Sequence, residues 1–271
     1  SWMTKNIRKE KKVALILHTD VRASSIPVTS AEGYEFLCSY SWKQFVVSTI
    51  YVPGTPPRWN PPLLPIQLMK DKGAHWVDQH GDKVPRFQFE PVFQALAIMN
   101  PNVRFDDVDI VVNRNTLQKL YSFASFKRSY KQFYIDLDMV GKTLFIGRRE
   151  RNASTTSPSG YGRNFENKFT SVDPSLVDAD GHHRVVRYKL GALNAVVRME
   201  VDGYYEVPAA PNDSSELNES SSKAPNEFFL NLLGTMEPAN AAIVHHNPQH
   251  TAVIRGGMLV PHNQTLELKS N

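Results

Sequence analysis

The sequence predicts an α+β fold in which mixed β-sheets are flanked by a few helices. Segments that alternate apolar or aromatic residues with polar ones, a pattern typical of strands, occur along most of the chain. Two pairs of such segments are separated by a short glycine-containing turn, which predicts two β-hairpins. Only three stretches are predicted as helices. Strands therefore dominate the prediction.

In the first half of the chain, aromatic and valine-rich runs predict strands, and a proline-rich segment predicts an extended loop. One helix is expected to begin near Pro91, because proline is well tolerated in the first turn of a helix. The predicted elements are strands at 13–17 and within 31–52, a loop at 53–65, a helix at 89–99, a strand at 109–112 and a helix at 116–123.

In the second half, the two predicted hairpins turn at Val140-Gly141 and at Gly191-Ala192. A helix is expected between them, after a turn rich in Ser, Thr, Pro and Gly. The predicted elements are strands at 133–138 and 143–146, a helix at 164–169, strands at 185–190 and 193–202, and strands at 241–244, 252–254 and 265–269.

Composition is that of an ordinary globular protein, with 41% hydrophobic and 10% aromatic residues among 271. No apolar run approaches the roughly 20 residues of a membrane-spanning helix, so no membrane association is expected. The N-terminal residues lack the apolar segment and cleavage site of a secretory signal. Together with a lone cysteine, Cys38, this predicts an intracellular protein of the nucleus or cytoplasm.

The formal net charge of +4 weakly favours a polyanionic partner but decides nothing alone. Residues 1–12 contain five lysine and arginine residues and are expected to form a basic arm, either solvated or in contact with nucleic acid. Residues 13–271 are expected to form a single domain. Within it, residues 208–225 are rich in Ser, Pro, Asn and acidic residues, which predicts a flexible insertion.

Near the C-terminus, two predicted strands each carry charged residues two positions apart. Glu200 and Asp202 would project from the same face of one strand, and Glu267 and Lys269 from the same face of the other. Acids beside an apolar layer are costly unless they are paired or hold a cation. If the strands pair, three carboxylates and a lysine converge, which is a pattern of metal-dependent phosphodiester hydrolysis. A solvated strand face is the alternative.

Carboxylate oxygens select hard cations, so Mg²⁺ or Mn²⁺ is the expected metal. An acidic pair followed by Glu-x-Lys on a neighbouring strand resembles the pattern of PD-(D/E)XK nucleases. Two upstream segments extend the resemblance. One is Asn113-Arg114-Asn115 at a strand-to-helix junction, and the other is Gly162-Arg163-Asn164-Phe165-Glu166.

In order and character, these four segments resemble the motifs of the DXO-like family of RNA 5′-end decapping exoribonucleases, over roughly residues 31–271. The resemblance implies a PD-(D/E)XK nuclease-like core and places the metal ions on Glu166, Glu200, Asp202 and Glu267. It gives Lys269 a role with the hydrolytic water and Arg114 a contact with RNA phosphates. The implied activity is removal of incomplete or NAD-type caps from RNA, 5′→3′ degradation, or both. The implied partners are a capped or 5′-monophosphate RNA end and a 5′→3′ exoribonuclease.

The chain departs from the family at several points. Asn113 and Asn115 flank Arg114 where the family has Trp-Arg-Gly, and Arg163 replaces an aromatic residue. The last two motifs are separated by a longer insertion, and the family continues well beyond Lys269. The resemblance therefore implies a fragment or a shortened, divergent member, whose own activity stays open.

Two other functions remain as alternatives: a catalytically weakened relative that acts as a binding partner in RNA processing, and a DNA-directed PD-(D/E)XK nuclease. Histidine clusters could instead suggest zinc, but no cysteine joins them. We expect His245, His246 and His250, and likewise Gly181-His182-His183, to lie in surface loops.

Overall fold

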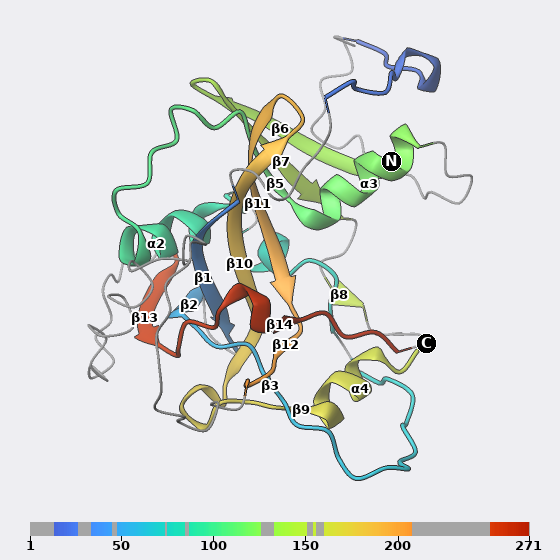
Figure 1. Cartoon of the computed structure of the whole chain (residues 1–271), viewed down its shortest axis with the longest axis vertical. Helices are drawn as coiled ribbons and strands as arrows, with labels where there is room; N and C mark the ends of the chain where they lie inside the picture. The colour runs from blue at the N-terminus through green and yellow to red at the C-terminus, as the bar shows by residue number, and fades with distance from the viewer. Residues whose placement is uncertain are drawn as a thin grey trace, which may run out of the picture.

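The computed structural model describes residues 14–26, 34–44, 48–73, 75–84, 87–125, 133–150, 154–155, 160–207 and 250–270. Most of its strands form one large sheet (Figure 1). These strands are β1 (Glu35–Lys43), β2 (Thr49–Pro53), β5 (Ile110–Asn113), β6 (Tyr134–Val140), β7 (Thr143–Arg149), β10 (Ala179–Leu190), β11 (Leu193–Val201) and β13 (Ala252–Gly256). Their order is β13-β2-β1-β10-β11-β5-β7-β6.

Two smaller sheets and four α-helices complete the described part. A four-stranded sheet has the order β14-β12-β3-β9, and β4 pairs with β8. The bounds of these strands are β3 (Arg58–Trp59), β4 (His75–Trp76), β8 (Ser154–Thr155), β9 (Thr170–Ser171), β12 (Gly203–Tyr204) and β14 (Thr265–Leu266). The helices are α1 (Gln79–Lys83), α2 (Glu90–Met99), α3 (Arg114–Ala124) and α4 (Gly162–Phe169), with 3₁₀ turns at His18–Asp20, Pro174–Leu176 and His262–Gln264.

The large sheet is mixed, which confirms the predicted α+β class. β10 and β11 form one antiparallel hairpin, and β6 and β7 form the other. β5 runs parallel to both β11 and β7 and so joins the two hairpins. Gly141 and Gly191 occupy the turns with φ of 60° and 63°, a conformation that favours glycine. Both hairpins were predicted from the sequence.

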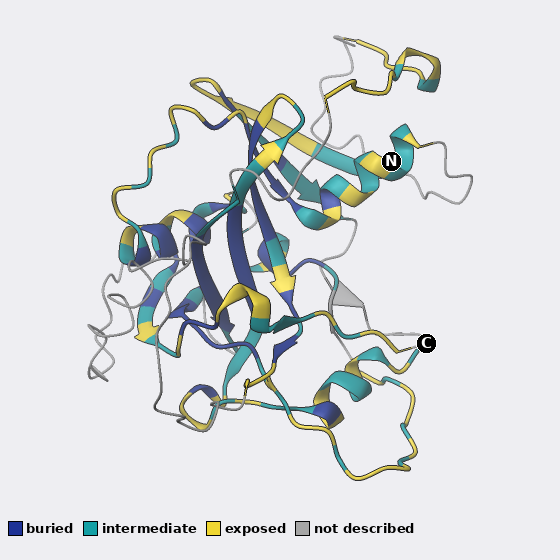
Figure 2. Cartoon of the chain, in the orientation of Figure 1, coloured by how far each residue is buried: buried dark blue, intermediate teal, exposed yellow. Residues whose placement is uncertain are grey.

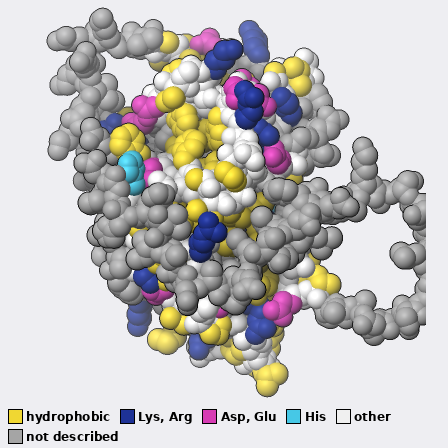
Figure 3. Space-filling model, turned by 90° about the vertical axis from the view of Figure 1, so that its left-hand side faces the viewer, with side chains coloured by type: hydrophobic (Ala, Val, Ile, Leu, Met, Phe, Trp, Pro, Cys, Tyr) yellow, Lys and Arg dark blue, Asp and Glu magenta, His cyan; other side chains and the backbone are white. Residues whose placement is uncertain are grey.

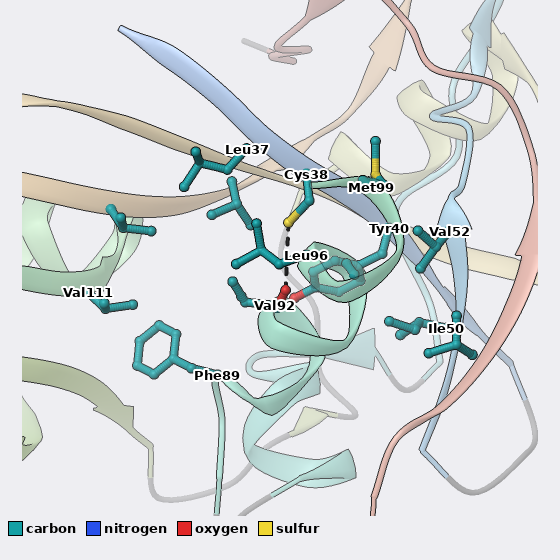
Figure 4. Packing of buried hydrophobic residues seen from close by; sticks show 14 of the residues in the cluster. Leu37, Cys38, Tyr40, Ile50, Val52, Phe89, Val92, Leu96, Met99 and Val111 are labelled. Atoms are coloured by element: carbon teal, nitrogen blue, oxygen red, sulfur yellow. Dashed lines mark hydrogen bonds between the residues drawn. The ribbon is translucent and has the colours of Figure 1, made fainter. Parts of the chain in front are cut away.

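The large sheet buries apolar residues on both faces (Figure 2). Side chains alternate between the faces of a strand, so on β5 Val111 faces one way while Ile110 and Val112 face the other. α2 covers the Val111 face, where Leu37, Cys38 and Tyr40 of β1 pack against it (Figure 4). α3 lies on the opposite face, where Leu117 meets Ile110 and Val112.

The small sheet joins segments that are far apart in the sequence. β12 pairs antiparallel with β14, with Gly203 opposite Leu266 and Tyr204 opposite Thr265, and it pairs in parallel with β3. This pairing brings the C-terminal segment to the end of β11 and beside α4 (Figure 1).

Some predicted elements differ from the structure. The predicted strand at 13–17 does not form over 14–17, where Leu15, Ile16 and Leu17 are exposed and no described strand pairs with them. The predicted strand at 265–269 ends at Leu266, and the predicted loop at 53–65 contains β3. The basic arm at 1–12, the insertion at 208–225 and the strand at 241–244 lie outside the described residues.

The surface beside α2 and β13 is partly apolar: Figure 3 shows hydrophobic side chains gathered in the upper half of this face. A shallow groove of about 470 Å³ in the described part is lined by Phe93, Phe105, Val140 and Phe145. None of the helices that the structure describes is long and apolar enough to cross a membrane.

Candidate functional site

Glu166, Glu200 and Asp202 line one cleft of about 500 Å³, and Asp71, Asp78 and Asp180 also border it. Glu200 is the second-last residue of β11, and Asp202 follows that strand directly. Glu166 comes from α4, near the same end of the large sheet (Figure 1). β11 and α4, which are separate elements of the chain, thus bring these three acids together.

The C-terminal segment meets this cleft at Asp202. The backbone N–H of Asp202 donates to the carbonyl oxygen of Leu266 (3.2 Å), and that of Leu268 donates to Oδ2 of Asp202 (2.7 Å). Nζ of Lys269 lies 3.9 Å from the same carboxylate oxygen. Glu267 and Lys269 therefore adjoin the cleft at Asp202 and are not among the residues that line it in the described part.

Glu267 is held by two cations. Lys269 Nζ donates to its Oε1 (2.6 Å), and Nη2 of Arg114 donates to both carboxylate oxygens (3.0 and 2.8 Å). Although burial opposes the shift, these hydrogen bonds hold the pKa of Glu267 below its ordinary value. Glu267 and Lys269 lie beyond β14 and so do not stand on a strand as predicted, although their side chains do meet.

Glu166, Glu200 and Asp202 resist being ionised together. Burial, followed by the charges of Asp202 and Glu200, raises the pKa of Glu166 to about 7. Burial, followed by the charges of Asp202 and Asp180, raises the pKa of Glu200 to about 7, and burial also raises the pKa of Asp202. Glu200 stays accessible from the cleft, but the walls around it remove much of its water.

This donor set fits a divalent cation, because a hard cation binds carboxylate oxygens and relieves their repulsion. In the part of the chain that the structure describes, however, no three His, Cys, Asp or Glu side chains are placed to hold one metal ion. Glu267 would have to leave Arg114 and Lys269 to join the other acids.

The raised pKa values predict a pH-dependent stability. Between about pH 4.5 and 7, Glu166 and Glu200 bind more protons in the folded protein than in the unfolded chain. Their favourable contribution to the free energy of unfolding is therefore fully present below about pH 4.5 and is lost as pH rises through about 7.

In EDTA, we expect the melting temperature of the wild type, relative to that of Glu200→Gln, to fall as pH rises over this window. Calorimetry of both proteins measures the difference between their melting temperatures. The titration of groups that the two proteins share cancels in this difference. Millimolar Mg²⁺ should restore most of the loss above pH 7, since a cation compensates the ionised carboxylates. A pH-independent difference would contradict the assignment.

α4 is fixed at its N-terminus, and this orients Glu166. The Asp71 carboxylate accepts hydrogen bonds from the backbone N–H groups of Arg163 (3.2 Å) and Asn164 (2.8 Å), which satisfies donors that the first turn leaves free. The Asn164 side chain donates in turn to the carbonyl oxygens of Met69 (2.8 Å) and Lys70 (3.1 Å). At the other end of α4, the Phe169 ring stacks on Trp59.

Two histidines that the sequence analysis placed in a surface loop are buried in β10, so this prediction was wrong. His182 and His183 are 3% and 7% exposed. His183 pairs across the sheet with Glu200, and its ring lies 4.5 Å from that of His80, whose Nε2 is 2.6 Å from the Tyr40 hydroxyl. Burial holds the pKa of both His80 and His183 well below the ordinary value, so they are neutral at pH 7.

The sequence analysis also missed Arg148 and Arg198. Arg148 lines the cleft, and Arg198 lies two residues before Glu200, on the same face of β11. The signal for the buried histidines was available, since Val185 and Val186 continue the strand after them. No local sequence pattern distinguished these two arginines from arginines that are exposed to solvent.

Comparisons with solved structures find distant similarity. The chain resembles S. pombe Rai1 with 12% identity and a TM-score of 0.44, over 70% of this chain and 58% of that one. The same values hold for S. pombe Rai1 in complex with 3'-FADP. Scheffersomyces stipitis Rai1 in complex with (3'-NADP)+ and calcium ion matches with 14% identity and a TM-score of 0.41, over 68% of this chain and 58% of that one. The chain thus spans less than two thirds of the length of these proteins.

No curated protein matches the sequence. One protein family does match it, over residues 10–264. This match covers nearly all of the described strands and helices, including β10, β11 and the segments that carry Glu166, Glu200 and Asp202. The chain therefore belongs to the family described as "Domain of unknown function (DUF8563)".

Proposed function

We propose that this chain is a divalent-metal-dependent hydrolase that acts on the 5′ ends of RNA. The observation that carries the proposal is the grouping of Glu166, Glu200 and Asp202 around one cleft, with the Lys269 ammonium beside Asp202. The acids come from segments with the spacing and order of the DXO-like motifs, Gly162 to Glu166 and Glu200-Val201-Asp202. Their raised pKa values reflect, after burial, the repulsion between neighbouring carboxylates, which a bound cation would relieve.

In this proposal Glu166, Glu200, Asp202 and Glu267 hold Mg²⁺ or Mn²⁺. When bound, such ions would activate water and stabilise the leaving oxygen of a phosphodiester. Glu267 has cations on both sides in the structure, so its entry into the site would release Arg114 and Lys269. The same exchange would free both cations for the substrate.

Lys269 and Arg114 act on the substrate. The hydrogen bond that Lys269 donates to Glu267 raises the pKa of Lys269, so its ammonium stays protonated at pH 7. In this form Lys269 donates hydrogen bonds to the attacking water or to the scissile phosphate. Arg114 offers a planar guanidinium, a geometry that suits phosphate oxygens.

The substrate class is a capped or 5′-monophosphate RNA end. Removal of incomplete or NAD-type caps, 5′→3′ degradation, or both would be the activity, and a 5′→3′ exoribonuclease would be a partner. These finer assignments rest on the order of the motifs and on the basic side chains beside the acids.

A catalytically weakened relative that binds RNA or a processing enzyme is the second candidate. The engagement of Glu267 by Arg114 and Lys269 favours it, because a site closed by its own cations holds metal poorly. A DNA-directed nuclease is the third candidate, since phosphodiester chemistry alone does not distinguish ribose from deoxyribose.

Metal binding and cleavage separate the three. Titration of Mn²⁺ into the protein by calorimetry should show saturable binding that Glu200→Gln weakens at least about tenfold, because one charged ligand is lost. Cleavage of 5′-phosphorylated and capped RNA should require the metal and stop in EDTA.

Absence of saturable Mn²⁺ binding would reject the enzyme in favour of the binding partner. Equal or faster cleavage of single-stranded DNA of the same sequence would reject RNA as the substrate.

A further inference from the structure

Arg184 is a fully buried arginine in the middle of the large sheet, away from the acidic cleft. It belongs to β10, where it pairs with Ser39 of β1 on one side and with Met199 of β11 on the other. The residue is 0% exposed and is not part of the cleft lining. Burial lowers the pKa of Arg184 to about 10, so the guanidinium is still charged at pH 7. The sheet therefore holds a positive charge in the interior of the protein.

Two contacts fix the position of the Arg184 guanidinium. Its Nη1 donates to the carbonyl oxygen of Val260 (2.6 Å). The group also lies over the Phe36 ring, 4.5 Å from its centre. A carbonyl dipole and an aromatic face stabilise a cation only in part, because neither carries a full negative charge.

The opposite edge of the guanidinium, formed by Nε and Nη2, has no partner among the described residues. Both nitrogens are buried, and neither donates a hydrogen bond there. The N–H groups of Nε and Nη2 point to the same side of an arginine, and together they match the two oxygens of a carboxylate. Burying a charge without a counter-charge is strongly destabilising. A negatively charged group on the Nε/Nη2 edge would compensate this cost.

Tyr34 supplies a third hydrogen-bond donor near Arg184. Its hydroxyl is buried and likewise has no partner in the described part of the chain. Burial, opposed by the Arg184 charge, raises the pKa of Tyr34 to about 12, so the hydroxyl keeps its proton at pH 7. The Tyr34 ring lies 4.9 Å from that of His262, which is exposed. The group of three side chains therefore reaches the surface at His262.

The charge of this group selects the kind of anion that it can bind. Burial, followed by the Arg184 charge, lowers the pKa of His262, so the imidazole is neutral at pH 7. Arg184 is then the one charged member of the three. Val186 and Met199, on the same face of the sheet as Arg184, are part of its apolar packing. In such surroundings a monoanion is matched by Arg184, whereas a dianion leaves one negative charge uncompensated.

We propose that Arg184, Tyr34 and His262 form a binding site for a small monocarboxylate. The two carboxylate oxygens accept from Nε and Nη2 of Arg184, and one of them also accepts from the Tyr34 hydroxyl. His262 lies at the outer side of the site. This site is separate from the acidic cleft and does not depend on the proposed hydrolysis of RNA.

The experiment titrates the full chain with sodium acetate, with sodium chloride added to keep the ionic strength constant. Isothermal titration calorimetry should show saturable binding of one acetate. At ten times the dissociation constant, acetate should raise the melting temperature by about 3 °C. Acetate that binds no better than chloride would overturn the proposal. So would inorganic phosphate that binds more tightly than acetate, because the site would then prefer a dianion.

Variants of Arg184 tie acetate binding to this side chain. Arg184→Lys keeps the charge but loses the Nε/Nη2 edge, so it should weaken acetate binding at least about tenfold. Arg184→Met should abolish binding. Without acetate, Arg184→Met should be at least as stable as the wild type, because the change removes an uncompensated buried charge.

The alternative source of a carboxylate is the chain itself. Glu32 lies two positions before Tyr34 in the sequence, outside the described residues. If Glu32→Gln lowers the melting temperature as much as Arg184→Met does, and acetate does not restore it, Glu32 is the partner of Arg184 and the proposal fails.

Tyr34→Phe tests the site with the loss of a single hydroxyl. It should weaken acetate binding about tenfold, because one hydrogen bond to the charged ligand is removed. Its melting temperature without acetate should not fall, since the hydroxyl has no partner in the described part. Tyr188→Phe is the matched control, because Tyr188 lies four residues after Arg184 on the same face of β10 and should not affect binding. Acetate binding that both Tyr34→Phe and Arg184→Lys retain in full would refute the site.

Discussion

Glu200→Gln and Asp202→Asn are each expected to lower metal-dependent RNA cleavage about a thousandfold or more, because the lost ligand supports several kcal/mol of transition-state stabilisation. Neither change should unfold the protein. Both carboxylates line the cleft, and their pKa values are raised by burial and by neighbouring acids. Removing one charge relieves that repulsion. RNA affinity in EDTA should be unchanged or higher, since the carboxylates repel phosphate.

Single-turnover cleavage with Mg²⁺ or Mn²⁺ measures the effect on catalysis, and anisotropy in EDTA measures RNA binding. Glu206→Gln is the matched control. Glu206 is a carboxylate that pairs with Arg58 at 3.3 Å on the exposed surface and is absent from the cleft lining. Its loss should change the rate by less than about twofold. Full activity in either acid variant, or cleavage that persists in EDTA, would show that these acids do not hold a catalytic metal.

Trp42→Ala is expected to lower the free energy of unfolding by about 3–5 kcal/mol, the usual cost of removing a large buried aromatic side chain. Trp42 is fully buried in β1. Its ring meets Tyr40 at 6.0 Å and His80 at 5.2 Å between centroids, in edge contacts. The change therefore leaves a cavity next to His80 and the floor of the acidic cleft.

Urea denaturation of the wild type, Trp42→Phe and Trp42→Ala tests this. In Trp42→Phe the smaller ring fills part of the space, so the free energy of unfolding should fall by less than half as much as in Trp42→Ala. Because the cavity borders the aromatic and histidine cluster under Glu200, metal affinity in Trp42→Ala should fall as well. Loss of stability below about 1 kcal/mol in Trp42→Ala would contradict the packing seen around β1.

Local sequence signals were sufficient for most of the helices and for both hairpins. Pro91 predicts a helix at 89–99, and the structure places α2 at Glu90–Met99. Glycines at 141 and 191 adopt the positive φ that the two hairpin turns require. Each of these features depends on residues within a few positions of one another, so the chain encodes them without reference to the rest of the fold.

The spacing of Glu200 and Asp202 is likewise local, and it was sufficient to predict a candidate site at the end of β11. Glu267 and Lys269 are different. Their meeting with Asp202 depends on the pairing of Gly203 with Leu266, and their engagement with Arg114 depends on where α3 begins. The sequence predicted the strand face but not these contacts.

The amino-acid sequence by itself determined the α+β class, the hairpins, α2 and the motifs that carry the acids, because periodicity and turn chemistry act over short stretches. Only the tertiary structure decided that Arg198 is buried and that Glu267 is held by Arg114 and Lys269. It also decided that an arginine-lined pocket opens beside Glu200. Burial and charge pairing depend on which strands become neighbours, and that choice is made by the sheet as a whole.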